Sequence, residues 1–219
     1  MGTKKILNTI VEPIKDLLLT PYSVWQILYV AYSCYFTLKG RKICLLGMPD
    51  VGKTRILRIL QGKEYDEEKD RQTPGGGEHY DSFVCEELGL RVSEGRDING
   101  DEVNIKQYYE GLIKKCYTVI FVFNIYKFLN DKKEESQTKD RFDNIYTLMK
   151  DQKKELAFIG THLDKFENKD EQRKAISKFL DRVRERQYFD MFKCLMAIDA
   201  TNTKNAKKEM YKIFKAEQT

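Results

Sequence analysis

Eight consecutive residues constrain the fold of this chain more than any other feature. They read Gly47-Met48-Pro49-Asp50-Val51-Gly52-Lys53-Thr54, which is the spacing G-x-x-x-x-G-K-[ST]. An apolar run of strand type, Lys42–Leu46, leads into them, and a helix-competent run begins at Lys53. Glycines let backbone N–H groups turn inward, and a helix start adds unpaired donors and the positive end of a dipole. Strand, loop and helix together predict a polyphosphate-binding loop, with a structural glycine-rich turn as the alternative.

Each position of this loop has an expected role. Lys53 brings a positive charge to the outer phosphates of a nucleotide, and the Thr54 hydroxyl can coordinate Mg²⁺. The residues expected to contact the nucleotide here are Gly47, Asp50, Val51, Gly52, Lys53, Thr54 and Arg55.

Composition and charge limit the classes of protein that the chain can belong to. Of its 219 residues, 41% are hydrophobic and 12% aromatic, which is enough for a packed core and excludes a disordered chain. The net charge of +5 is a mild excess, so we expect no nucleic-acid partner. The five cysteines are scattered and form no C-x-x-C pair, which favours reduced thiols in the cytosol. Cys44 and Cys194 fall in expected buried strands and are interpreted as small core residues.

The first 40 residues differ from the rest of the chain. Their apolar residues repeat at helical spacing, and Leu17–Leu38 contains no charged residue. That stretch is long enough to span a hydrocarbon core of about 30 Å, and its tyrosines suit an interface equally well. Three interpretations of residues 1–40 stay open: a membrane anchor, a helical hairpin packed on the domain or a partner, and a cleaved signal peptide. An anchor followed by Lys39, Arg41 and Lys42 would leave the rest of the chain at the cytosolic face of a membrane.

Strand-like and helix-like runs alternate over residues 41–219, which we expect to form one domain. The expected strands are Lys42–Leu46, Asp81–Leu88, Leu90–Glu94, Thr118–Asn124, Glu155–Ile159 and Cys194–Ile198. The expected helices are Lys53–Gln61, Val103–Lys115, Lys139–Lys150, Asp170–Gln187 and Lys204–Lys215. The tight turn Glu87-Leu88-Gly89 makes a hairpin of the second and third strands. This order predicts an α/β fold with a doubly wound, mostly parallel six-stranded sheet and helices on both faces.

Two further motifs follow expected strands. Asp97-Ile98-Asn99-Gly100 comes after the third strand, where a carboxylate can reach Mg²⁺ through water and the Gly100 N–H can meet a terminal phosphate. A plain turn is the alternative for this motif.

Gly160-Thr161-His162-Leu163-Asp164-Lys165 comes after the fifth strand. There the Asp164 carboxylate can accept both the ring N–H and the exocyclic amine of guanine. Adenine lacks this pair of donors, so the wrong base would leave a buried charge unpaired.

With these motifs the chain resembles the small GTPases of the Ras and Arf type over roughly residues 41–217. Thr161 and His162 replace the Asn and Lys of the usual N-K-x-D, and T-H-x-D resembles the Roc-type GTPase domains. Asp199-Ala200-Thr201-Asn202 resembles the S-A-K loop of the family. The resemblance implies a Ras-like fold, Mg²⁺-dependent GTP binding and switching between GTP- and GDP-bound shapes. It adds these expected nucleotide contacts: Thr161, His162, Asp164, Lys165, Ala200 and Thr201.

The resemblance also implies a first switch at Thr73-Pro74-Gly75, with Thr73 sensing Mg²⁺ and the γ-phosphate. A plain Pro-Gly turn is the alternative. The expected metal ligands are then Thr54, Thr73 and Asp97, and the expected catalytic residues are Lys53, Thr73, Gly100 and Asp101.

Two functional hypotheses follow. The family usually has a glutamine where this chain has Asp101, and a carboxylate there repels the γ-phosphate. The first hypothesis is therefore a GTP-hydrolysing switch that turns over slowly or with an activating protein, acts on an unknown effector and is attached to a membrane by residues 1–40. The second is a GTP-binding scaffold with negligible turnover. A P-loop kinase or ATPase is a third, weaker alternative because no arginine-rich lid is evident.

Overall fold

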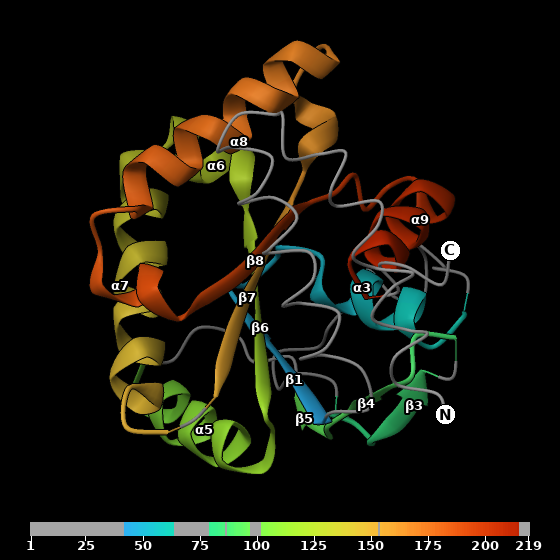
Figure 1. Ribbon diagram of the computed structural model, residues 1–219, viewed down its shortest axis with the longest axis vertical. Coiled ribbons are helices and arrows are strands. Elements are labelled where there is room, and N and C mark those ends of the chain that lie inside the picture. The colour runs from blue at the N-terminus through green and yellow to red at the C-terminus, as the bar shows by residue number, and fades with distance from the viewer. Residues whose placement is uncertain (1–41, 64–78, 86, 97–101, 153, 215–219) are drawn as a thin grey trace, which may run out of the picture.

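The computed structural model describes residues 42–63, 79–85, 87–96, 102–152 and 154–214 (Figure 1). Within this part, six strands form a sheet in the order β3-β4-β1-β6-β7-β8, and β2 and β5 form a separate two-stranded ribbon. All neighbours in the larger sheet are parallel except β3 and β4, which make the expected hairpin. The predicted α/β fold with one antiparallel strand is confirmed.

The elements have the following bounds. The strands of the larger sheet are β1 Lys42–Gly47, β3 Phe83–Cys85, β4 Leu90–Val92, β6 Thr118–Asn124, β7 Glu155–Thr161 and β8 Phe192–Ala197. The ribbon consists of β2 His79–Tyr80 and β5 Gly95–Arg96. The helices are α3 Lys53–Leu60, α5 Glu102–Lys115, α6 Ile125–Asn130, α7 Lys132–Met149, α8 Lys169–Val183 and α9 Thr203–Phe214, with 3-10 turns η2 Leu163–Lys165 and η3 Gln187–Met191.

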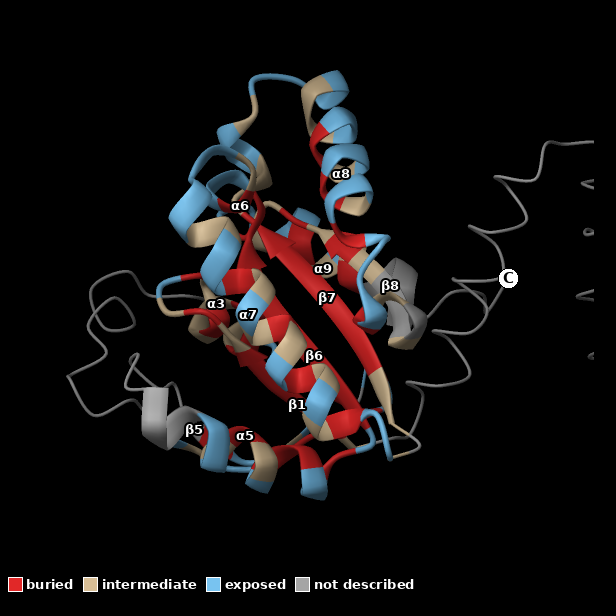
Figure 2. Ribbon diagram, turned by 90° about the vertical axis from the view of Figure 1, so that its left-hand side faces the viewer, coloured by how far each residue is buried: buried red, intermediate tan, exposed pale blue. Residues whose placement is uncertain are grey.

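The helices cover both faces of the larger sheet. Helices α5, α6, α7 and α8 gather on one face, and α3 packs with α9 on the other (Figure 1). All seven residues of β6 are buried, as expected for a strand covered on both sides. Figure 2 shows the buried residues concentrated on β1, β6 and β7 at the centre of the molecule.

Several predicted boundaries were wrong, and the reasons are local. The helix expected at Lys139–Lys150 begins seven residues earlier, at Lys132, because the Asp131 side chain accepts from the backbone N–H groups of Lys133 and Glu134. Helix α6 was missed altogether. It is only six residues long, and the Asn124 side chain caps it by accepting from the N–H of Lys127. The ribbon of β2 and β5 was also not predicted, because two-residue strands carry no periodicity.

Three other differences concern the ends of elements. The predicted strand Asp81–Leu88 shrinks to β3, and the predicted helix Asp170–Gln187 ends at Val183. Strand β7 extends two residues past its expected end, to Thr161. Among the described residues, no helix combines the length and the apolar character that crossing a bilayer requires. The interpretations of residues 1–40 fall outside the described residues.

Candidate functional site

The loop between β1 and α3 takes the shape that its glycines predict. Gly47 ends β1 and pairs with Val122 of β6, so closely that a Cβ atom on Gly47 would lie 2.3 Å from the Val122 carbonyl oxygen. Asp50 and Gly52 have φ angles of 53° and 82°, in the left-handed region. Gly52 is the N-cap residue of α3, and its carbonyl accepts from the N–H of Ile56 at 3.1 Å. The loop therefore turns back over the start of the helix.

The side chain of Lys53 points into this loop. It is only 7% exposed, and its Nζ atom donates to the Met48 carbonyl at 2.6 Å. Its positive charge therefore lies inside the loop that leads into α3, and both that charge and the start of a helix favour an anion. Thr54 and Arg55 follow in the first turn of α3 and are partly exposed.

Thr161 joins the segment that follows β7 to the loop between β1 and α3. It is fully buried at the end of β7, and its hydroxyl lies 2.8 Å from the Val51 carbonyl and 3.1 Å from the Phe123 carbonyl. Both carbonyls are acceptors only, so the hydroxyl proton goes to one of them. The hydroxyl oxygen is also 3.0 Å from Nδ1 of His162, and it can accept a hydrogen bond from that nitrogen when Nδ1 carries the proton. This arrangement orients the imidazole ring relative to the loop.

Of the remaining residues of the segment, His162 and Leu163 are half-buried, and Asp164 and Lys165 are exposed. His162 has a φ of 61°, and the short helix η2 after it carries Asp164 and Lys165, both exposed. Burial lowers the pKa of His162, with the nearby positive charges of Lys165, Lys127 and Arg55 adding to the effect and Asp164 opposing it. At neutral pH the imidazole is therefore uncharged.

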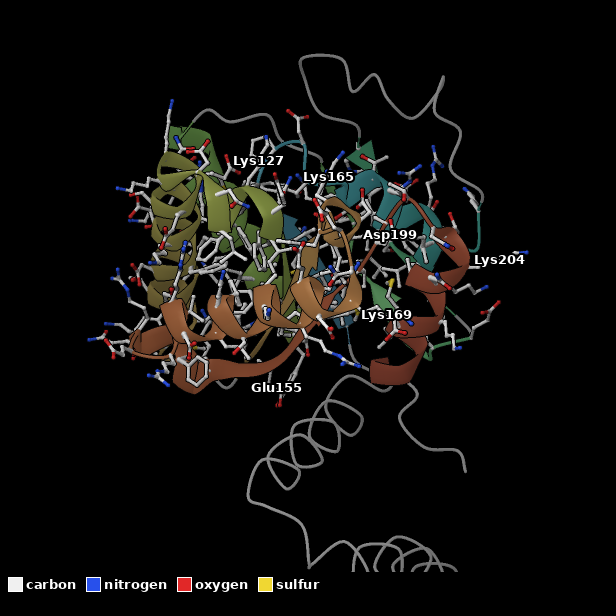
Figure 3. All side chains as sticks on the ribbon, turned by 90° about the horizontal axis from the view of Figure 1, so that it is seen from above. Lys127, Glu155, Lys165, Lys169, Asp199 and Lys204 are labelled. Carbon is white, nitrogen blue, oxygen red and sulfur yellow. The ribbon has the colours of Figure 1, made fainter. Side chains whose placement is uncertain are left out.

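Strand β8 brings the third motif next to this segment. The N–H of Leu163 donates to the Ile198 carbonyl, and the N–H of Ile198 donates to the Gly160 carbonyl. Beyond them the Asp199 carboxylate accepts from the N–H groups of Thr201 and Asn202 at 2.8 and 3.3 Å. Ala200 is buried at 7% exposure within this turn. Figure 3 shows Lys165 between Lys127 and Asp199 when the molecule is seen from above.

The three motifs thus meet at one edge of the sheet, beyond the carboxyl ends of the parallel strands β1, β7 and β8. In doubly wound sheets this edge, where helices change faces, is where ligands bind. Two contributions at this edge were not predicted from the sequence: the positive charge of Lys127, which acts on His162, and the Asp199 carboxylate, which accepts from the N–H of Thr201. The Asp-Ala-Thr-Asn composition of that turn was a usable signal for Asp199. Lys127 lies on the helix that was missed.

The described residues suit a polyphosphate better than a bare metal ion. In that part of the chain, no three His, Cys, Asp or Glu side chains gather closely enough to hold a metal. Lys53 and the start of α3 supply positive charge, which an anion requires. Of the expected magnesium ligands only Thr54 is described, and one hydroxyl holds Mg²⁺ only together with phosphate oxygens. Thr73, Asp97, Gly100 and Asp101 lie outside the described residues.

No protein-family model matches the sequence, and no curated protein matches it in sequence. Among solved structures, the chain is similar to a bacterial selenocysteine-specific elongation factor, EF-Sec (TM-score 0.51, 18% identity), covering 83% of this chain and 30% of that one. It is also similar to a probable GTP-binding protein, EngB (0.52, 13%), covering 80% of this chain and 100% of that one. A third is Era of Aquifex aeolicus bound to GDP and AlF₄⁻ (0.52, 15%), covering 81% of this chain and 57% of that one.

The chain therefore spans well under two thirds of the EF-Sec and Era chains that it resembles. At these identities the likeness concerns the fold alone, and this chain shares its α/β fold with these three proteins.

Proposed function

We propose that the chain binds a guanine nucleotide at the sheet edge described above and hydrolyses GTP to GDP and phosphate as a molecular switch. One observation carries the proposal. The Thr161 hydroxyl contacts the carbonyl of Val51, which places the segment that would read the base directly against the loop that would hold the phosphates. One ligand with a base at one end and phosphates at the other fits that arrangement.

The chain's own residues would divide the work as follows. Lys53 exchanges its bond to Met48 for the outer phosphates, and the N–H groups around Gly52 and Thr54 donate to the inner ones. The Asp164 carboxylate accepts from the two donors of guanine, and Ala200 offers its N–H to the base oxygen. Thr54, Thr73 and Asp97 would hold Mg²⁺, which would supply neutralising charge for the phosphates.

Water attack on the γ-phosphate would depend on Thr73, Gly100 and Asp101. The Asp101 carboxylate is the reason to expect slow turnover, because it adds negative charge beside a negatively charged phosphate. The same observation favours the alternative, a GTP-binding scaffold with negligible turnover. Phosphate release measured over hours, with and without cell lysate as a source of an activating protein, separates the two. Release that stays at the level of GTP alone supports the scaffold.

Replacing Asp164 by Asn tests the assignment of the base. Guanine offers two donors to a carboxylate, whereas xanthine offers one donor and one carbonyl, which match the oxygen and nitrogen of an amide. We expect Asp164→Asn to weaken mant-GDP binding about a hundredfold or more and to strengthen mant-XDP binding. Titration of both fluorescent nucleotides against both proteins measures this. An unchanged preference for GDP in the variant contradicts the assignment, and Asp170→Asn, an exposed carboxylate on α8, serves as the control.

The proposal includes a location. The scattered cysteines favour the cytosol, and residues 1–40 would attach the protein to the cytosolic face of a membrane. Pelleting of the full chain with carbonate-washed membranes tests the attachment, and a full chain that stays in the supernatant rejects it.

A further inference from the structure

Two cysteines from different elements meet beside β1, the strand that leads into the phosphate loop. The Sγ atoms of Cys44, in β1, and Cys116, between α5 and β6, are 2.7 Å apart. Both residues are buried, with exposures of 1% and 4%, and neither is in a disulfide. A bonded pair of sulfur atoms is about 2.05 Å apart, so a small further approach would join them.

Lys154 places a positive charge near this pair of cysteines. The Nζ atom of Lys154 donates to the carbonyls of Ile113 and Cys116, the latter at 2.5 Å. These carbonyls belong to the end of α5, where a positive charge also complements the helix dipole. The charge of this ammonium group favours the thiolate form of both cysteines.

The two thiols are not equivalent. A hydrogen bond from Cys44 lowers the pKa of Cys116 and outweighs its burial, with the Lys154 charge acting in the same direction. Burial raises the pKa of Cys44, which is the deeper of the two. The thiolate is the reactive form of cysteine, so Cys116 would be the nucleophile of the pair and Cys44 the resolving thiol.

Joining the sulfur atoms would disturb few other contacts. The Cys116 thiol lies 3.6 Å from the Ile113 carbonyl, and that carbonyl keeps its bond from Lys154 when the thiol proton is lost. Strand β1 and helix α5 are already held together nearer the loop, where the Tyr109 hydroxyl donates to the Gly47 carbonyl at 3.3 Å. A disulfide would therefore fix an existing contact.

We propose that Cys44 and Cys116 form a redox-modification site, in which a peroxide converts the two thiols to a disulfide that ties β1 to the end of α5. The Cys116 thiolate attacks one peroxide oxygen, the O–O bond breaks, and a sulfenic acid forms with hydroxide, which takes a proton to become water. The Cys44 sulfur then attacks the sulfenic sulfur. The S–O bond breaks, and the leaving hydroxyl takes the Cys44 proton to become a second water.

A disulfide between Cys44 and Cys116 would enclose the segments that we propose to contact the phosphates. In chain order, the ring closed between residues 44 and 116 contains the phosphate loop, Thr73 and Asp97–Asp101. This step rests on the proposed function: a link that restrains both ends of the nucleotide-responsive segments slows nucleotide release. We expect mant-GDP to dissociate several-fold more slowly from the oxidised protein, and dithiothreitol to restore the original rate.

The covalent step is tested on the full chain without nucleotide. Hydrogen peroxide is added, remaining thiols are alkylated, and the protein is digested with trypsin under non-reducing conditions. The expected product joins the peptide Ile43–Lys53 to the peptide Cys116–Lys127, with the loss of two hydrogens (about 2 Da). Reduction with dithiothreitol should separate the two peptides.

Variants and controls complete the design. Cys44→Ala and Cys116→Ser should each abolish the linked peptide, and Cys85→Ser, in the hairpin strand β3, should leave it in place. The proposal is overturned if peroxide leaves both thiols unchanged. It is also overturned if Cys116 is oxidised without forming the linked peptide, or if either cysteine is linked to a different cysteine. The digest of the unsubstituted protein decides the question even if a variant fails to fold. A linked peptide without an effect on mant-GDP release would retain the site and reject its link to the proposed function.

Discussion

Gly47 and Gly52 are glycines for different physical reasons. At Gly47 the backbone approaches β6 so closely that a side chain would collide with the Val122 carbonyl. At Gly52 nothing lies within 4 Å of an added Cβ atom, and the requirement is the φ of 82° that lets the loop enter α3. The motif spacing predicts both glycines, but only the structure separates the close approach from the left-handed turn.

Two glycine-to-alanine substitutions use this distinction. Gly47→Ala should destabilise the protein by about 3 kcal/mol, because the Cβ atom would lie 2.3 Å from a backbone oxygen held in the centre of the sheet. Gly111→Ala, at an exposed position of α5 with open space around it, should stabilise it by about 0.5–1 kcal/mol. Urea unfolding measures both. Equal effects would mean that the approach of β1 to β6 is looser than described.

Thr161 connects the loop between β1 and α3 with the segment after β7 through a hydroxyl group. The family that the sequence resembles usually has Asn there, and this chain uses a hydroxyl that reaches Val51 and Phe123. Because both carbonyls are buried acceptors, a residue without a donor at this position would leave them without this partner. The threonine hydroxyl therefore links the segment after β7 to the loop between β1 and α3.

The helices on one face of the sheet pack through aromatic side chains. Phe123 of β6, Phe142 of α7 and Phe179 of α8 contact one another, with ring centroids 4.7–6.4 Å apart. Phe128 of the short helix α6 joins the same cluster, 5.1 Å from Phe179. This packing explains why α6 forms although it is too short to be stable alone.

Tyr188 of η3 is the one polar member of this aromatic cluster among the described residues. It is fully buried, and its hydroxyl has no hydrogen-bond partner there, while burial raises the pKa of the phenol. Tyr188→Phe removes an unsatisfied polar group and keeps the ring contact with Phe142, so it should stabilise the protein by about 1 kcal/mol. Urea unfolding tests this. Tyr126→Phe serves as the control: this residue is 39% exposed, and the substitution should change stability by less than about 0.5 kcal/mol. A loss of stability in Tyr188→Phe would contradict the prediction and would indicate a hydrogen-bond partner for the Tyr188 hydroxyl.

The topology of the sheet assembles the site from segments that are far apart in the chain. Strands β1, β6, β7 and β8 are parallel, so their carboxyl ends share one edge, and helices leave that edge toward both faces (Figure 1). A ligand that bridges these ends would hold β1, β7 and β8 together and would stabilise the folded domain as a unit.

Nucleotide should therefore raise the thermal stability of the entire domain. A ligand that binds only the folded state adds about 2.7 kcal/mol of stability at a concentration of 100 times its Kd. We expect the melting temperature to rise with the concentration of GDP and Mg²⁺, and not with ATP and Mg²⁺ at the same concentrations. Differential scanning fluorimetry measures both series. Equal shifts with the two nucleotides would remove the case for guanine recognition.

Local pattern alone predicted the main strands, the hairpin of β3 and β4 and the glycine-rich loop before α3. The loop is defined by eight adjacent residues, and the buried strand β6 by an uninterrupted apolar run, so neighbours in sequence carry the information. Helix α6 and the ribbon of β2 and β5 were missed because a side-chain cap and two-residue pairings decide them, and neither gives a periodic pattern.

The sequence by itself determined which segments we propose to bind phosphate and base, because each motif is complete within a few consecutive residues. Only the tertiary structure decided that Thr161 touches Val51, 110 residues away, and that Cys44 meets Cys116, 72 residues away. Contacts of that kind depend on strand order and register. Those are set by how the hydrophobic faces of all elements pack together, and no single stretch of the chain encodes them.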